Sequence, residues 1–271
     1  MKKVVLAIDG KNLSVGSFDF IIRMNEGQSI LLTGVFLPAV EETELLYSLG
    51  GMTGPVYLPA ISRLDDETEE VVKRFEELCQ KNNIEYRVHN NTIDNVVEAL
   101  KQESRYTDLM VIGSESFYSH LGKERQHEYL LHVLHKSECP VLLVPEKYAF
   151  PQSLVIAFDG SASSVFAMKQ FSYLFPDLCS LDTIAVFSSN TKDFPNWDYV
   201  EELIARHYSN LSVTKLNLDA SKYFESWVAD IKNTMVVAGA YSRSFISEVL
   251  KKSFVDNIIN GHSIPVFIAH V

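Results

Sequence analysis

The stretch VVLAIDGKNLS at residues 4–14 returns as LVIAFDGSASS at residues 154–164, aligned without a gap at an offset of 150 (154 − 4). Each copy is a short apolar run that stops at an Asp-Gly pair, whose acid is Asp9 in the first copy and Asp159 in the second. Such a run, ended by a turn signal, is typical of a strand that is buried on both faces of a parallel sheet. Two such openings predict two copies of one α/β unit.

The predicted units also end alike, with a strand, a helix and a closing strand. The segments that share this pattern are DLMVIGS (108–114) with CPVLLV (139–144), and TMVVAGA (234–240) with IPVFIA (264–269). Here the offset falls to 126 between Gly113 and Gly239, and to 125 between Pro140 and Pro265. The second copy is therefore about 25 residues shorter in its middle.

We predict a first domain over residues 1–146, with an insert at 38–63, and a second domain over residues 151–271. Between the end motifs, apolar runs alternate with segments of helical spacing, such as 65–82 with its acidic start. This alternation predicts an α/β fold of two tandem, doubly wound, five-stranded parallel-sheet domains of Rossmann-like type. The insert combines Gly and Pro breakers with aliphatic and aromatic residues, which favours an arm that docks elsewhere.

Composition narrows the classes of function. The 271 residues are 46% hydrophobic and carry a net charge of −11 without a basic cluster, so we expect no nucleic-acid partner. No apolar run reaches the roughly 18 residues of a membrane helix, and the chain enters a strand within its first residues, so we expect a cytoplasmic protein without a membrane partner. Cys79, Cys139 and Cys179 show no metal or redox spacing and resemble core residues.

Chemistry in such a sheet is expected at the carboxyl ends of the strands, near the switch in strand order. The predicted strands place Asp9 and Gly113 there in the first domain, and Asp159 and Gly239 in the second. Backbone amides at the start of a following helix favour an anion such as a phosphate.

One helical segment also offers a metal-binding pattern. Glu128, His132 and His135 are spaced by four and three residues, which could place ligands on one helix face. Apolar residues at the intervening positions make this helix amphipathic. The simpler interpretation is that the histidines lie on its solvated face, and we predict no metal site.

These motifs resemble those of the universal stress protein family. The resemblance rests on the strand ending in A-I/F-D-G, the later strand ending in Gly, and the closing strand that begins with Pro-Val, all of which occur twice. It covers nearly the whole chain and points to the tandem type, with two fused domains of the adenine nucleotide alpha hydrolase-like fold.

The resemblance implies an adenine-nucleotide site at positions that match the family's motif. These positions are Asp9, Val35 and Gly113 in the first domain, and Asp159, Val186, Gly239 and Ser253 in the second. Nucleotide-binding members carry a phosphate loop of glycine, two residues, glycine, nine residues, and glycine followed by Ser or Thr. The second glycine is replaced by Ser116 in the first domain and by Ser242 in the second, and the third is replaced by Lys252 in the second.

The leading expectation is a non-enzymatic stress-response or regulatory protein with degenerate nucleotide-binding loops and no certain cofactor. Its two domains would pair through their closing strands as an internal pseudo-dimer, with a homodimer as a further assembly and an unknown signalling partner. The alternative is an ATP-binding switch or slow ATP hydrolase that uses the second domain, where Ser253 remains and Lys251 and Lys252 could offset phosphate charge. A third option is a different, apolar ligand in the degenerate pocket.

Overall fold

A computed structural model describes residues 1–9, 11–38, 66–91, 95–188, 196–216, 220–239, 261 and 263–271. Contacts divide the chain into two compact units, Met1–Cys139 (unit 1) and Pro140–Val271 (unit 2). Nearly all of the insert at 38–63 lies outside the described residues, as do Lys251, Lys252 and Ser253.

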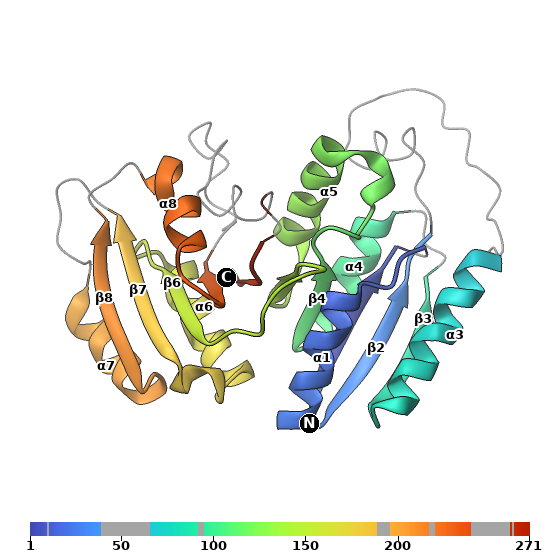
Figure 1. Ribbon diagram of the computed structural model, residues 1–271, viewed down its shortest axis with the longest axis horizontal. Coiled ribbons are helices and arrows are strands. Elements are labelled where there is room, and N and C mark those ends of the chain that lie inside the picture. The colour runs from blue at the N-terminus through green and yellow to red at the C-terminus, as the bar shows by residue number, and fades with distance from the viewer. Residues whose placement is uncertain are drawn as a thin grey trace. The chain divides into compact units, whose positions relative to one another are not determined.

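Unit 1 contains four parallel strands in the order β3-β2-β1-β4. Their bounds are β1 Lys2–Ile8, β2 Ile30–Phe36, β3 Glu85–Asn90 and β4 Leu109–Gly113. Every residue of β4 is buried, as the apolar run predicted. The strand order reverses between β1 and β4, so the carboxyl ends of these two strands form the switch point (Figure 1).

Helices connect the strands of unit 1 and cover its sheet. They are α1 Val15–Gly27, α3 Asp66–Lys81, α4 Val96–Arg105 and α5 Lys123–Lys136, with a 3-10 turn η1 at Ser119–Leu121. Phe18 of α1 and Phe75 of α3 contact each other edge to face, with ring centroids 6.2 Å apart, which places these two helices on one face. Side-chain caps start two of the helices: Ser14 accepts from the amide of Ser17, and Asn95 accepts from that of Glu98.

Unit 2 repeats this arrangement. Its strands are β5 Val141–Val144, β6 Ser153–Ala157, β7 Asp182–Ser188, β8 Asn210–Leu216, β9 Thr234–Ala238 and β10 Val266–Ile268. Its helices are α6 Ala162–Leu174, α7 Trp197–His207 and α8 Ala220–Ala229, with a 3-10 turn η2 at Leu178–Ser180. The strand order is β5-β10-β9-β6-β7-β8, and all neighbours except β5 and β10 are parallel.

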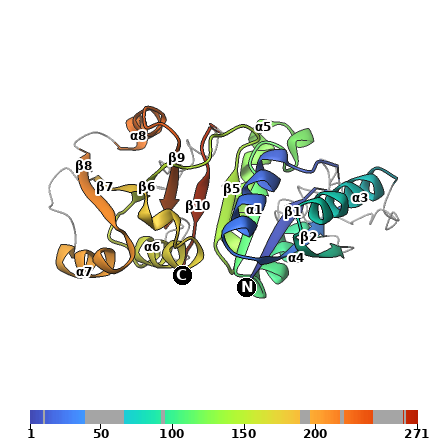
Figure 2. The same ribbon diagram turned by 60° about the horizontal axis from the view of Figure 1, so that its bottom comes forward.

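The closing strands of the two sequence copies pair with each other. In β5 and β10, Leu143 lies opposite Val266 and Val141 opposite Ile268, in antiparallel register (Figure 2). This pairing assigns β5 to unit 2, although the repeat in the sequence ends only at residue 146. The end of the sequence repeat and the boundary defined by contacts need not coincide, and the domain bounds read from the repeat stay a prediction.

The predicted fold class, a doubly wound α/β architecture with mainly parallel strands, is confirmed. Element bounds differ by a few residues. The helical segment predicted at 65–82 is α3, which spans Asp66–Lys81, and a φ of +80° at Gly122 separates η1 from α5. Within the described part of the chain, no helix is both long and apolar enough to cross a membrane.

Candidate functional site

A cavity of about 360 Å³ lies at the carboxyl end of β6 in unit 2. Its walls come from the end of β6, the first turn of α6 and the first two turns of α7 (Figure 1). The lining residues are Phe158, Gly160, Val165, Asn196, Tyr199, Val200 and Leu203. The volume falls within the roughly 300–1,000 Å³ of small-molecule sites, and the walls are mainly apolar, as such sites usually are.

Asp159 lies between two residues of this lining, Phe158 and Gly160. Its side chain is exposed, and its Oδ1 accepts a hydrogen bond of 2.8 Å from the amide of Ser161. Gly160 has a φ of +81°, which permits the sharp turn from β6 into α6. Among the described residues, Oδ2 of Asp159 accepts no hydrogen bond, and the side chain itself is not part of the cavity lining.

The other predicted residues of the second domain lie on the strands next to β6. Val186 of β7 and Ala238 of β9 both pair with Ala157, so Val186 and Gly239 flank the end of β6. A Cβ atom added to Gly239 would lie 2.2 Å from the carbonyl carbon of Ser163 and from the amide nitrogen of Ser164. Gly239 therefore lets the strand end pack directly on the start of α6, and this packing requires a glycine with or without a phosphate.

In the first domain the carboxylate of the corresponding turn, Asp9, is buried and fully hydrogen-bonded. Asp9 is 1% exposed, and each of its carboxylate oxygens accepts two hydrogen bonds. Oδ1 accepts from the amides of Lys11 (3.1 Å) and Asn12 (2.9 Å), and Oδ2 accepts from Asn12 Nδ2 (3.4 Å) and the amide of Tyr118 (3.0 Å). A carboxylate offers about four acceptor positions, so these four donors use its capacity.

The loop after β4 is packed against this carboxylate. Tyr118 is fully buried in a left-handed backbone conformation (φ 55°), and its hydroxyl donates to the carbonyl of Pro38 at 2.8 Å. Its ring contacts those of Phe117 and Tyr129, with centroids 4.7 and 5.0 Å away. Gln126 Nε2 donates to the carbonyls of Ser114, Glu115 and Phe117, so the loop directs these carbonyls inward.

A second difference between the domains lies beneath α3 and α7. Sheet register matches Val35 with Val186, and matches His89 with Thr214 at an offset of 125 (214 − 89). At the same offset the buried positions of the helices coincide, so Phe75 is the counterpart of Val200, a wall of the cavity. The ring of Phe75 lies edge to face with those of Phe18, Phe36 and Tyr86, at 5.7–6.2 Å.

The larger side chain of Phe75 fits because the residue beneath it in β2 is Gly34, which has no side chain. A Cβ atom added to Gly34 would lie 2.8 Å from the tip of the Phe75 ring. The counterpart of Gly34 in β7 is Ala185, since Leu6 pairs with Gly34 and Ile156 with Ala185. The first domain therefore has a Gly–Phe pair where the second has an Ala–Val pair, and the aromatic ring fills space that borders the cavity in the second.

The structure places the predicted residues in two separate sets. Asp9, Val35 and Gly113 lie at one strand edge of unit 1, and Asp159, Val186 and Gly239 lie at the corresponding edge of unit 2. Ser253 lies outside the described residues. Sequence reasoning missed Tyr118 and Tyr199; an aromatic residue soon after each strand end was visible, but nothing in the sequence gave its orientation.

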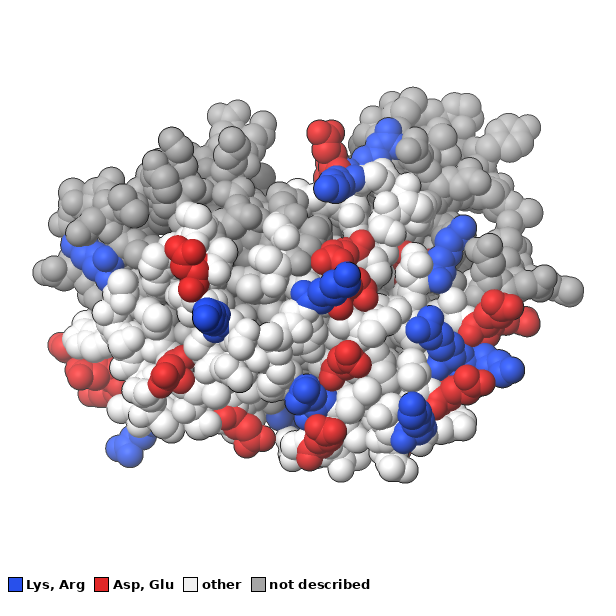
Figure 3. All heavy atoms as spheres, in the orientation of Figure 1, with Lys and Arg blue, Asp and Glu red and all other residues white. Residues whose placement is uncertain are grey.

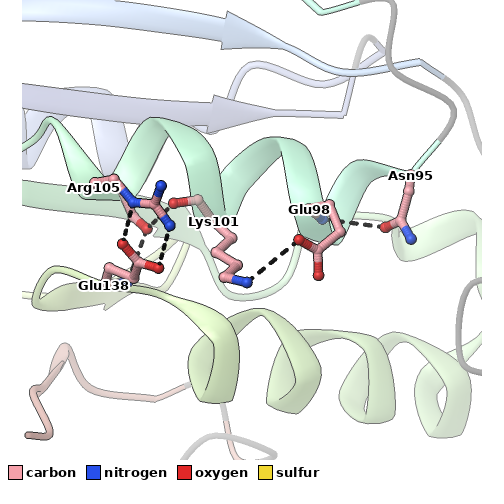
Figure 4. Close-up of polar contacts among 6 residues, drawn as sticks. Asn95, Glu98, Lys101, Arg105 and Glu138 are labelled. Carbon is pink, nitrogen blue, oxygen red and sulfur yellow. Dashed lines mark hydrogen bonds and ion pairs between the residues drawn. The ribbon is translucent and has the colours of Figure 1, made fainter.

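A smaller hollow of about 220 Å³ lies on the exposed face of α4, lined by Glu98, Lys101, Gln102 and Arg105. Its cations are already paired. Arg105 donates two hydrogen bonds to Glu138 (2.6 and 2.8 Å), and Lys101 Nζ lies 3.5 Å from Glu98 Oε2 (Figure 4). The hollow therefore lies between exposed side chains that pair with each other, and it is no candidate for a ligand site.

The charges and thiols of the described residues add no second site. On the face that Figure 3 shows, Lys and Arg of the described residues are interspersed with Asp and Glu. No group of three His, Cys, Asp or Glu in the described chain is placed to hold a metal ion, and this includes the helix with His132 and His135. Burial raises the pKa of the Cys79, Cys139 and Cys179 thiols to about 12, which leaves them protonated and unreactive at neutral pH.

Comparison with solved structures agrees with this architecture over almost the whole chain. A universal stress protein from Archaeoglobus fulgidus superposes with a TM-score of 0.67 at 16% sequence identity, over 99% of this chain and 96% of that chain. The fold is that of a universal stress protein. No protein-family model and no curated protein matches the sequence. At this level of identity the universal stress protein fold is shared, while the site described above is defined by this chain's own residues.

Proposed function

We propose that this protein is a non-enzymatic, cytoplasmic regulator of the stress response, of the tandem universal stress protein type, and that its second domain senses an adenine nucleotide. The observation that carries the proposal is the cavity next to the Asp159-Gly160 turn, at the carboxyl end of β6. Ligands of doubly wound α/β folds bind at this place.

The residues present fit the base and ribose of a nucleotide. Tyr199, Val200 and Leu203 form an apolar wall against which a planar base can pack, and Tyr199 is 77% exposed and free to be covered. A ribose hydroxyl can donate to Oδ2 of Asp159. The family's phosphate positions are Gly239 and Ser253, and the second of these lies outside the described residues.

A binding role is favoured over catalysis by the chemistry of the lining. Among the described residues that line the cavity, none is a His, Cys, Lys or acid that could act as nucleophile or general base, and the neighbouring Asp159 is assigned to ribose binding. Pairing of the two domains through their closing strands is part of the proposal, and the antiparallel register of β5 and β10 supports it. Such pairing would cover two apolar strand edges that would otherwise attract other chains.

The test begins with protein purified without added nucleotide. The protein is denatured, released small molecules are identified by mass spectrometry, and ATP is then titrated into the emptied protein by calorimetry. We expect a bound adenine nucleotide or a measurable affinity for ATP, and a weaker affinity in Asp159→Asn. Flat titrations with an empty preparation would refute nucleotide sensing. Release of inorganic phosphate from ATP that is lost in Asp159→Asn would replace the regulator with a slow hydrolase.

A further inference from the structure

The two Asp-Gly turns began as copies of one sequence and now have opposite exposures. Asp159 is exposed and keeps one oxygen without a donor among the described residues, whereas Asp9 is 1% exposed with four donors. A buried carboxylate is stable only when it is fully hydrogen-bonded, so the donors around Asp9 cannot be surrendered to a ligand without loss of stability.

We infer that the first domain is a closed structural copy in which Asp9 is a positioning residue for Tyr118, and that the chain takes one ligand, in the second domain only. The inference rests on the proposed function for the ligand, but its structural half stands on the first domain alone. The family resemblance implies that Asp9 contacts a ligand, whereas here its carboxylate holds the amide of Tyr118. We call this contact the lock.

Tyr118 shows why a lock is needed. A bulky residue in the left-handed region is costly, and it persists only where the surrounding structure fixes it. Here the amide of Tyr118 donates to Asp9, which follows β1, and its hydroxyl donates to Pro38, which follows β2. One residue therefore joins the loop after β4 to the ends of β1 and β2, where a ligand would have to enter.

The packing beneath α3 closes the same copy from the other side. Phe75 occupies the position that Val200 holds at the wall of the second domain's cavity, and Gly34 provides the space for its ring. Two independent features, one polar and one apolar, thus distinguish the closed copy from the open one.

The experiment compares two matched substitutions in the full chain, Asp9→Asn and Asp159→Asn. Calorimetric titration with ATP gives the stoichiometry and Kd, thermal unfolding gives Tm, and hydrogen exchange by mass spectrometry follows the segment around Tyr118. For the wild type we expect one ATP per chain. Asp159→Asn should weaken ATP binding about tenfold or more and leave Tm nearly unchanged, since it removes one charged hydrogen-bond acceptor from an exposed site.

Asp9→Asn should lower Tm by about 5 °C or more, because an amide cannot accept all four hydrogen bonds. It should speed hydrogen exchange around Tyr118 while α4 keeps its protection, and it should leave Kd and the stoichiometry of one unchanged. If Asp9→Asn does not fold, Tyr118→Phe serves instead: it removes only the bond to Pro38, and it should show the same local rise in exchange with a smaller fall in Tm.

Two ATP per chain, or a stoichiometry that Asp9→Asn halves, would overturn the inference. So would an Asp9→Asn protein whose Tm and local exchange match the wild type. Absence of ATP binding in the wild type refutes the proposed ligand and the single site with it, yet the lock is still decided by the Tm and exchange of the two variants.

Discussion

Single atoms decide what the two predicted phosphate-loop glycines do. Both lie at strand ends against the start of the helix that follows β1 or β6, and both lack space for a methyl group. At Gly239 the obstacle is backbone, 2.2 Å from an added Cβ, whereas at Gly113 the nearest atoms belong to side chains, the hydroxyl of Ser116 at 2.4 Å and Cβ of Ser14 at 2.6 Å. The sequence motif predicted glycine for phosphate contact; the structure explains it by close packing.

This difference gives a prediction for the pair. Gly239→Ala should lower the free energy of unfolding by about 3 kcal/mol, because helix α6 must move, and Gly113→Ala by about 2 kcal/mol, since the Ser116 hydroxyl can rotate away and only Cβ of Ser14 must shift. Urea unfolding of both variants measures the values. A greater loss for Gly113→Ala would contradict the packing explanation.

At the scale of the elements, the cavity depends on what packs between α3 and β2 in one domain and between α7 and β7 in the other. Gly34 and Phe75 fit each other as a small residue beneath a large one, and Ala185 and Val200 occupy the matching positions. Corresponding elements in the same order thus pack around an aromatic ring in one copy and around a smaller aliphatic side chain, which lines the cavity, in the other.

We predict that Gly34→Ala and Phe75→Val are strongly coupled. Gly34→Ala alone should cost about 1–3 kcal/mol by overpacking, and Phe75→Val alone about the same through a cavity. The double variant, which copies the second domain's pair, should cost at least about 1 kcal/mol less than the two losses combined. Additive losses in a double-mutant cycle by urea unfolding would show that the two positions do not share this space.

The elements themselves were largely predictable from sequence, and the site only in part. Buried strands such as β1 and β6 are visible in the sequence as apolar runs, and the helical segment predicted at 65–82 matches α3, Asp66–Lys81. The different fates of Asp9 and Asp159 were not predictable, because they depend on Tyr118, a residue 109 positions from Asp9 in the chain. Local sequence specifies a turn, but only tertiary packing decides whether that turn is buried.

At the scale of the whole molecule, buried thiols couple stability to alkaline pH. Burial raises the pKa of Cys79, Cys139 and Cys179 to about 12, while thiols in the unfolded chain titrate near about 8.5. Between these values the unfolded chain has lost protons that the folded chain retains. Stability is therefore fully present below about pH 8.5 and falls as pH rises toward 12.

We expect each thiol to contribute a loss of about 1–2 kcal/mol by pH 10, on the same linkage relation. Thermal unfolding from pH 7 to 10.5 measures the decline, and Cys79→Ala with Cys179→Ala is the control, in which it should be shallower. A wild type and a double variant with parallel pH profiles would show that other groups dominate.

The first unit has Gly34 beneath Phe75 where the second has Ala185 beneath Val200. This difference should also be visible in the sequences of related proteins. If one residue in each pair makes room for the other, the two positions cannot drift independently during descent. Related chains with Ala at the position of Gly34 should then carry a smaller residue at that of Phe75. Covariation of these two positions among related sequences would show that the two side chains share one space.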